Sequence, residues 1–236
     1  MELEIRSWEL GGLTSIGHDK IHLWTASLIQ PFSTTANLKT CLSLDEIKRA
    51  NRFRFDDIRQ KFIVGHGVLR FILARYLNIS PPDIIFHYGK FGKPYLDSTC
   101  NTIGLQFNLA HSHEMIVFGI ILGHRIGVDL EYIRPVEHKA SISKQFFSMK
   151  EYTVWQLLPD EEKTVGFFNC WTRKEAYIKA IGKGFSYPLD KFAVSLRPNE
   201  PAKLEWVHDS SDEVNRWAMQ PFSLADKYIG VVVVEV

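Results

Sequence analysis

The stretch IGVDLE, residues 126–131, is the part of this chain that says most about its fold. Its residues alternate in the way typical of a β-strand, whose side chains point to opposite faces in turn. Val128 and Leu130 can therefore enter a core, while Asp129 and Glu131 share the other face. Two carboxylates this close repel each other, so each favours a partner that neutralises it. Magnesium is such a partner, although the short motif alone equally fits an exposed strand with two solvated acids.

Strands and helices alternate on both sides of this stretch, which predicts a mixed α/β or α+β fold. The pattern places helices at residues 44–54, 56–76, 143–157 and 161–181, and strands at 22–28, 84–88, 106–109, 115–122, 126–133, 192–196, 202–207, 217–223 and 228–234. Ser43 and Glu46 have the spacing of a capping box at the start of the first helix. The tight connection 123–125 predicts a hairpin between the strands on either side of it.

The two halves of the chain have a loosely similar order of elements. Each half has a helix-rich stretch followed by strands, and the division falls near Gly123. The sequence therefore predicts two similar lobes, residues 1–123 and 124–236.

Composition narrows the class of protein. The chain has 236 residues, of which 45% are hydrophobic and 23% charged, values ordinary for a soluble globular protein. Its formal net charge of +1 gives no broad field for nucleic acid or an anionic membrane, so an anion site must be built locally. Three widely spaced cysteines form no C-x-x-C pair. Together with a charged N-terminal segment, these features predict a cytoplasmic location.

The segment Trp171–Ala180 has helical spacing and places Glu175 one turn before Lys179. A simple interpretation is a surface ion pair worth about 0.3–0.5 kcal/mol. The functional interpretation makes Glu175 a third carboxylate at the metal or a general base. Lys179 would then be a cation directed at a phosphate or a leaving group.

Two further segments could meet a phosphate. The turn Gly89–Tyr95 carries Lys90 and Lys93, although it lacks the order of a Walker A loop and also fits a surface turn. His111 lies at the end of the strand predicted at 106–109 and could hydrogen-bond phosphate. A zinc site with His113 has no third ligand at a suitable spacing, and Ser112 lacks the G-x-S-x-G context of a nucleophile.

Taken in order, four segments make the chain resemble the two-lobed, Sfp-type 4′-phosphopantetheinyl transferases. They are Gly92–Pro94, Phe107–Ser112, Gly127–Glu131 and Trp171–Gly182. The last two carry the family's most specific signatures, G-[VI]-D-[IL]-E and W-[TS]-x-K-E-[AS]-x-x-K. The resemblance extends over residues 50–196, and the ends of the chain match in style only. It departs at Ala110, where the family usually has a serine, so this chain has no hydroxyl there to bind phosphate.

The resemblance implies a pseudo-dimer of two similar lobes, each a small antiparallel sheet packed with a long helix, and an active-site cleft between them. Such an enzyme moves the 4′-phosphopantetheine arm of coenzyme A to a serine of an apo-carrier protein, as a holo-[acyl-carrier-protein] synthase does, and releases 3′,5′-ADP. Asp129, Glu131 and Glu175 would hold Mg²⁺. Lys93 and His111 would contact coenzyme A phosphates.

The remaining roles follow from the same resemblance. Arg52 is a further phosphate contact, Glu175 is the candidate base, and Lys179 would contact phosphate and assist the leaving group. A carrier of fatty-acid, polyketide or non-ribosomal peptide synthesis would dock on residues 136–150, where lysines surround Phe146, Phe147 and Met149. The expected enzyme is a monomer with no nucleic-acid or membrane partner. The alternatives are another magnesium-dependent phosphotransferase or phosphodiesterase, and an inactive module that binds coenzyme A or a carrier.

Overall fold

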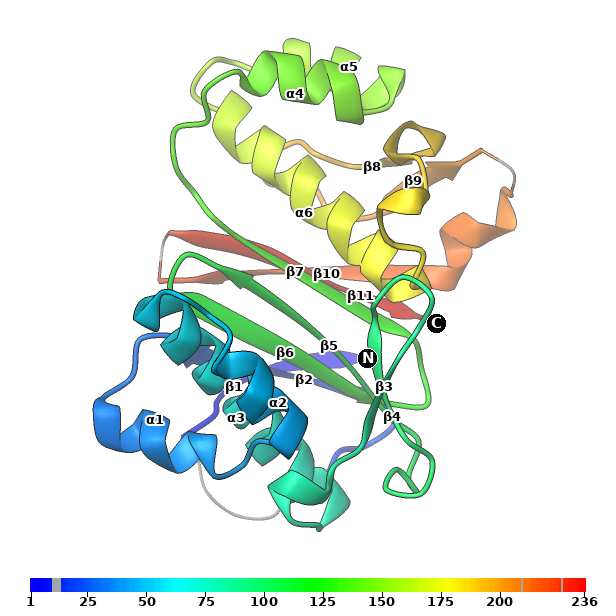
Figure 1. The fold of residues 1–236 in the computed structure, drawn as a ribbon. Helices are drawn as coiled ribbons and strands as arrows, with labels where there is room; N and C mark the ends of the chain where they lie inside the picture. The colour runs from blue at the N-terminus through cyan, green and yellow to red at the C-terminus, as the bar shows by residue number, and fades with distance from the viewer. Residues whose placement is uncertain (10–13, 209, 226) are drawn as a thin grey trace. The chain divides into compact units, whose positions relative to one another are not determined.

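The computed structural model describes residues 1–9, 14–208, 210–225 and 227–236 (Figure 1). The α-helices are α1 (Phe32–Lys39), α2 (Leu44–Ala50), α3 (Asp56–Leu77), α4 (Lys139–Phe146), α5 (Met149–Gln156) and α6 (Lys163–Ile181). The strands are β1 (Glu2–Ser7), β2 (Lys20–Ser27), β3 (Phe86–Tyr88), β4 (Pro94–Leu96), β5 (Leu105–Ser112), β6 (Met115–Leu122), β7 (Ile126–Tyr132), β8 (Phe192–Val194), β9 (Leu204–Val207), β10 (Trp217–Leu224) and β11 (Tyr228–Glu235). Short 3-10 helices lie at Pro81–Asp83, Gly184–Ser186, Leu189–Lys191 and Asp212–Arg216. The mixed α/β fold expected from the sequence is confirmed.

The chain groups into two compact units. Unit 1 contains Met1–Gly89, Pro94–Phe107 and Glu114–Gly123, and unit 2 contains Lys90–Lys93, Asn108–His113 and His124–Val236. Two short segments from before residue 123 therefore belong with the C-terminal part of the chain. The division into lobes at residue 123 stays a prediction.

Unit 1 is built on a four-stranded sheet of order β1-β2-β6-β5. Strand β2 runs antiparallel to β6, but β1 runs parallel to β2, so the prediction of a purely antiparallel sheet is wrong here. The separation of Ser7 and Lys20 in sequence permits this direction, because parallel strands need a connection of about a dozen residues or more. Helix α3 packs on this sheet, where the Tyr76 hydroxyl bonds His22 Nδ1 at 2.6 Å and Trp24 Nε1 at 2.7 Å.

The short helix α2 is fastened to α3 by one buried glutamate. The capping box predicted at Ser43 and Glu46 is confirmed. The Glu46 carboxylate also accepts from Arg70 Nε at 2.6 Å, and Arg70 donates to the carbonyls of Pro81 and Ile84. Helix α2 ends at Ala50 rather than at residue 54, because beyond the C-cap Asn51 the N–H groups of Arg52 and Phe53 bond carbonyls three residues back in a turn.

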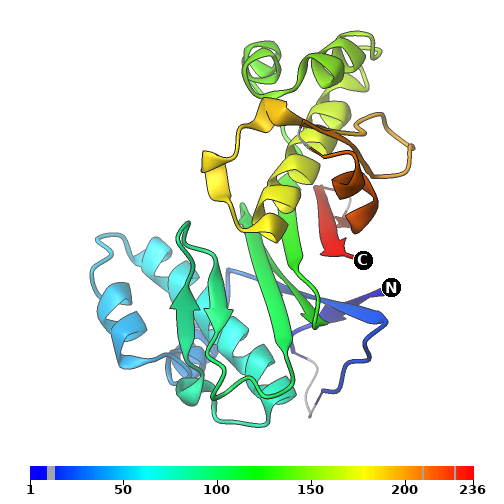
Figure 2. The ribbon, with the colours of Figure 1, turned by 90° about the vertical axis from the view of Figure 1, so that its right-hand side faces the viewer.

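Unit 2 is built on a three-stranded antiparallel sheet of order β10-β11-β7, with Asp129 opposite Val231. Helix α6 lies across one face of this sheet, and α4 and α5 pack beside its N-terminal half, as the turned view in Figure 2 shows. The core between them includes Phe147, Phe167 and Tyr177. Among the described residues, no helix is long and apolar enough to cross a membrane.

Two predictions about connections are wrong. Strands β6 and β7 form no hairpin: β6 pairs with β2, while β7 pairs with the valine-rich β11, far along the sequence. Local spacing favours pairing between strands that are neighbours in sequence. Tertiary packing instead pairs β7 with β11, a strand that is buried on both faces. The predicted helix 143–157 is two helices, because Ser148 leaves the helical conformation to cap α5 in a second capping box with Glu151.

We expect the Glu46 carboxylate to make stability depend on acid pH. Burial alone would raise its pKa, but hydrogen bonds from His66, the Ser43 backbone N–H and Arg70 outweigh burial and lower the pKa from its ordinary value of 4.5 to about 2. A lowered pKa stabilises the folded state above the unfolded value and loses this effect as the pH falls toward the folded value. Glu46→Gln should cost about 3 kcal/mol at pH 7, because it leaves the Arg70 charge buried and unpaired.

Urea denaturation at neutral pH and at several values below 4.5 measures this contribution. The stability difference between wild type and Glu46→Gln should shrink steadily as the pH falls toward 2. A difference that stays constant over that range would contradict the assignment.

Candidate active site

The close approach of β7 and α6 creates this site. A Cβ atom on Gly127 would lie 2.0 Å from the Ala176 carbonyl oxygen and 2.4 Å from the Ala180 nitrogen. Only glycine leaves room for this contact between a strand and a helix. Because strand residues alternate, the two later residues Asp129 and Glu131 lie on the same face as Gly127, toward α6. The face shared by the two carboxylates, predicted from the sequence, is thus the one that meets the helix.

Asp129 is buried at the centre of the site, with 6% of its surface exposed. Its Oδ1 accepts from Lys179 Nζ at 2.7 Å, while its Oδ2 is buried without a hydrogen-bond partner. Burial raises the pKa of this carboxyl to about 6, although Lys179 opposes the rise, and the neighbouring charge of Glu131 adds to it.

Glu175 faces Asp129 from α6. Its Oε1 is buried without a partner. Burial and then the charge of Asp129 raise the pKa of Glu175 to about 7. Lys179 forms its ion pair across to Asp129 on β7, so the simple interpretation of a surface Glu175–Lys179 pair is not what the structure contains.

Glu131 is held by a side chain from the end of β5. Its Oε2 accepts from Ser112 Oγ at 2.9 Å, and the same hydroxyl accepts from the Tyr132 backbone N–H at 3.0 Å. Asn108 also holds the backbone of β7, since its Oδ1 accepts from the Val128 N–H at 2.9 Å. Sequence reasoning placed both polar residues in a motif but assigned them no role in holding β7.

A buried ion pair that sequence reasoning missed fixes the rotation of α6. Lys174 and Glu151 are each 1% exposed, and Lys174 Nζ lies 2.8 and 2.7 Å from the two carboxylate oxygens. Lys174 also donates to the Phe192 carbonyl, and Glu151 accepts from the Val194 N–H. Because Lys174 is anchored on the core side, the next residue, Glu175, is directed toward β7. The capping-box spacing of Ser148 and Glu151 was the available sequence signal.

The predicted phosphate contacts lie in different surroundings. Lys93 Nζ donates to the Ile126 carbonyl at 2.8 Å and the Ala180 carbonyl at 3.2 Å, joining the start of β7 to the end of α6. Burial, and then the charge of Arg125, lower the pKa of Lys93 to about 8. His111 is exposed near the end of β5, and Arg52 is exposed in the turn after α2, within unit 1.

The oxygens of this site suit a divalent metal, although the side chains are not yet arranged around one. Within the described residues, no group of three or more His, Cys, Asp or Glu side chains could hold a metal ion. Asp129 Oδ2 and Glu175 Oε1 are nevertheless buried oxygens without partners, and a buried polar atom of this kind calls for an ion or a water. Carboxylate oxygens are ligands that Mg²⁺ prefers, so the donor set fits that ion.

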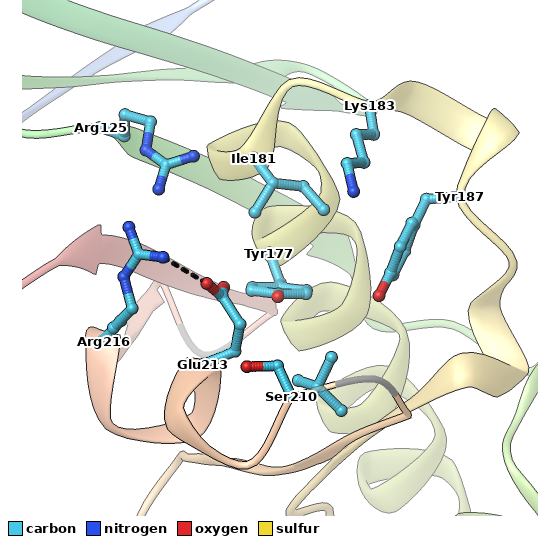
Figure 3. Close-up of a pocket in the computed structure, with 9 residues that line it drawn as sticks. Arg125, Tyr177, Ile181, Lys183, Tyr187, Ser210, Glu213 and Arg216 are labelled. Carbon is cyan, nitrogen blue, oxygen red and sulfur yellow. Dashed lines mark hydrogen bonds and ion pairs between the residues drawn. The ribbon is translucent and has the colours of Figure 1, made fainter.

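A pocket of about 300 Å³ lies at the C-terminal end of α6 (Figure 3). Its lining residues are Arg125, Tyr177, Ile181, Lys183, Tyr187, Val207, Ser210, Glu213 and Arg216. Two of its cations are already neutralised, because Arg125 forms two hydrogen bonds with Glu235, and Arg216 pairs with both Glu213 and Glu235. The pocket therefore adds little positive charge beyond that of the exposed Lys183.

Comparison with known proteins gives consistent matches over most of the chain. Residues 125–232 match the 4′-phosphopantetheinyl transferase superfamily, and residues 24–120 match the 4′-phosphopantetheinyl transferase N-terminal family. The chain is 44% identical to the 4′-phosphopantetheinyl transferase HetI of Nostoc sp. over 187 residues, which cover 79% of this chain and 78% of the relative. It is 29% identical to the 4′-phosphopantetheinyl transferase Sfp of Bacillus subtilis, with 70% of each chain covered. A crystal structure of the holo-[acyl-carrier-protein] synthase of Thermotoga maritima matches 47% of this chain and 61% of its own, with 19% identity and a TM-score of 0.37.

We expect Gly127→Ala to destabilise the protein by at least about 3 kcal/mol. The new Cβ meets backbone atoms of Ala176 and Ala180, which cannot move aside without shifting the helix. Gly65→Ala on α3 is the matched control, because its Cβ would meet only the flexible ends of Ile116 and Leu28 at 3.3 and 3.7 Å. Chemical denaturation of the two variants measures the difference, and equal stabilities would contradict this account of the contact.

Glu175→Gln should raise stability at pH 8 in the absence of divalent metal. A carboxyl whose folded pKa lies above its ordinary value of 4.5, here at about 7, destabilises the folded state above pH 7, and the effect disappears as the pH falls toward 4.5. The melting temperature of the variant should exceed that of wild type by about 3 °C at pH 8 and by less at pH 5. Glu161→Gln, on an exposed glutamate, should show no such pH dependence. A lower melting temperature for Glu175→Gln at pH 8 would refute the prediction.

Proposed function

We infer the chemistry of this site from one premise: the chain belongs to the 4′-phosphopantetheinyl transferase family. Its activity is the transfer of the 4′-phosphopantetheine arm of coenzyme A to a carrier protein. We propose that the acceptor is a serine hydroxyl, that 3′,5′-ADP is released, and that the carboxylates of β7 and α6 are the reacting centre.

We propose that Mg²⁺ would be held by Asp129, Glu131 and Glu175. The observation that carries this assignment is the pair of buried, unpartnered oxygens, Asp129 Oδ2 and Glu175 Oε1, on facing elements. When bound, the cation would neutralise charge on the pyrophosphate of coenzyme A. Glu131 is already engaged by Ser112, so we expect it to contribute through a water or after a change of partner.

Glu175 is also the proposed general base. A pKa of about 7 suits a group that must be ionised before reaction and able to accept a proton near neutral pH. In this step the serine oxygen attacks the β-phosphorus of coenzyme A, its proton passes to Glu175, and the bond to the 3′,5′-ADP oxygen breaks. Lys179 lies one turn further along α6 and, held at 2.7 Å from Asp129, would stabilise the negative charge on that leaving oxygen.

We propose His111, Lys93 and Arg52 as contacts to the phosphates of coenzyme A, with His111 near the 3′-phosphate. Lys93 donates two of its three N–H bonds to carbonyls, which leaves one for a phosphate oxygen. Ala110 is buried and offers no hydroxyl, so a phosphate oxygen at this position would have to be bound by a backbone N–H.

The carrier protein is proposed to dock on residues 136–150. Phe147 is part of the core, whereas Met149 is 80% exposed. Met149 borders a pocket of about 700 Å³ that is also lined by Lys144, Lys150 and Trp206. An apolar anchor near lysines suits an acidic carrier helix. Service to an acyl carrier protein, and so the narrower activity of a holo-[acyl-carrier-protein] synthase, is part of this proposal. The cytoplasmic location and the monomeric state stay predictions.

Incubation with coenzyme A, Mg²⁺ and an apo-carrier protein, followed by mass spectrometry of the carrier, tests the proposal. The carrier should gain one phosphopantetheine group, and chelation of divalent metal should stop the gain. Asp129→Asn and Glu175→Gln should each lower the single-turnover rate by at least about 100-fold, while Glu161→Gln should leave it unchanged. Near-normal turnover by Glu175→Gln would refute its assignment as base and metal ligand. Hydrolysed coenzyme A beside an unchanged carrier would indicate a phosphodiesterase, and binding without reaction would indicate an inactive module.

A further inference from the structure

A pocket of about 500 Å³ in unit 2 is not used by the proposed chemistry. Its floor is one stripe of α6, formed by Val165, Asn169 and Arg173, which follow one another at intervals of four residues. Its walls come from the turn Pro198–Pro201 and from residues of β10 and β11, including Pro221 and Ile229.

The floor of this pocket contains a buried positive charge. Arg173 is only 4% exposed, and burial lowers the pKa of its guanidinium. Its Nη1 donates to the Ser195 carbonyl at 2.6 Å and to Ser195 Oγ at 3.0 Å. A guanidinium has five N–H bonds, and these two contacts leave Nε and Nη2 for another acceptor. Glu200 and Glu205 act on this charge only from beyond ion-pair distance. A buried charge without a direct ion pair is costly, and a bound anion would reduce that cost.

The other deeply buried cations of the protein have carboxylate partners. Arg70 pairs with Glu46 at 2.6 Å, and Lys174 pairs with Glu151 at 2.7 Å. Arg173 forms no ion pair with a carboxylate in the part of the chain that the structure describes. The arginines of the pocket in Figure 3 are paired with glutamates of that same region. Arg173 is therefore the buried cation for which an acceptor from outside the chain fits best.

The walls indicate what kind of anion would fit. Ile229, Val165 and the prolines present apolar surface, which suits a ligand with an apolar body. Glu200 lies at the rim, 47% exposed and 3.5 Å from Arg197. Its negative charge opposes a doubly charged phosphate more than a singly charged carboxylate. A planar guanidinium also matches a carboxylate with two parallel hydrogen bonds.

We propose that this pocket binds a small organic carboxylate, with its charged end on Arg173 and its apolar body against Val165 and Ile229. The site is separate from the proposed reacting centre. Successive residues of a helix are turned by about 100°, so Arg173 and Glu175 leave α6 on nearly opposite sides. The proposal therefore adds a second binding site to the transferase rather than another contact for coenzyme A.

Benzoate is a suitable probe. Benzamide, which has a similar shape but no charge, is its control. Isothermal titration calorimetry at constant ionic strength should give a dissociation constant on the order of 1 mM for benzoate on the full chain. Benzamide should bind at least about tenfold more weakly, because it lacks the charge that pairs with Arg173. Arg173→Met, which keeps the length but removes the charge, should weaken benzoate to the same extent. No saturable benzoate binding, or equal affinity in Arg173→Met, would overturn the proposal.

A second variant covers the case in which Arg173→Met fails to fold. Ser223 is exposed on the edge strand β10 and lines the pocket. Ser223→Trp should fill the pocket without touching the hydrogen bonds between Arg173 and Ser195, and an aromatic residue is compatible with a strand. It should abolish benzoate binding while phosphopantetheine transfer continues. Unchanged benzoate binding in Ser223→Trp would place the ligand elsewhere and overturn the assignment.

Discussion

The backbone contact between β7 and α6 at Gly127 is the constraint on which the functional part of the structure depends. A strand usually lies farther from a helix, because side chains separate the two. Here the strand comes close enough that a single methyl group would overlap the carbonyl of Ala176. The short separation brings Asp129 within 2.7 Å of Lys179 and near enough to Glu175 for their charges to interact. Lys93 joins the same two elements beside this contact, through the carbonyls of Ile126 and Ala180.

The two units orient their long helices with the same device. In each, a short helix begins with a serine capping box, and the glutamate of that box pairs with a buried cation on the following long helix. Glu46 pairs with Arg70 on α3, and Glu151 pairs with Lys174 on α6, at sequence separations of 24 and 23 residues. In both cases the cation also donates to a backbone carbonyl beyond the helix. This shared arrangement is a more specific similarity between the two units than the loosely similar order of their elements.

The proposed reacting centre contains two carboxylates whose ionised forms destabilise the folded protein. Burial raises the pKa of Asp129 to about 6 and that of Glu175 to about 7, so at neutral pH their charges oppose folding. Proteins commonly retain such groups where chemistry needs them. The supporting contacts of Ser112, Asn108 and Lys174 hold the carboxylates in place in spite of this cost.

The sequence by itself determined the long helices, most strands and the capping box at Ser43, and it led to the proposal for the functional carboxylates. These features depend on local periodicity and on motifs, which neighbouring residues encode. The sequence could not determine that β7 pairs with β11, that β1 runs parallel to β2, or that Lys179 pairs with Asp129 rather than with Glu175. Each of those choices depends on which distant segments meet. The buried partners of Lys174 and the lack of an ion pair at Arg173 also became visible only in three dimensions, because the cost of a buried charge depends on what surrounds it.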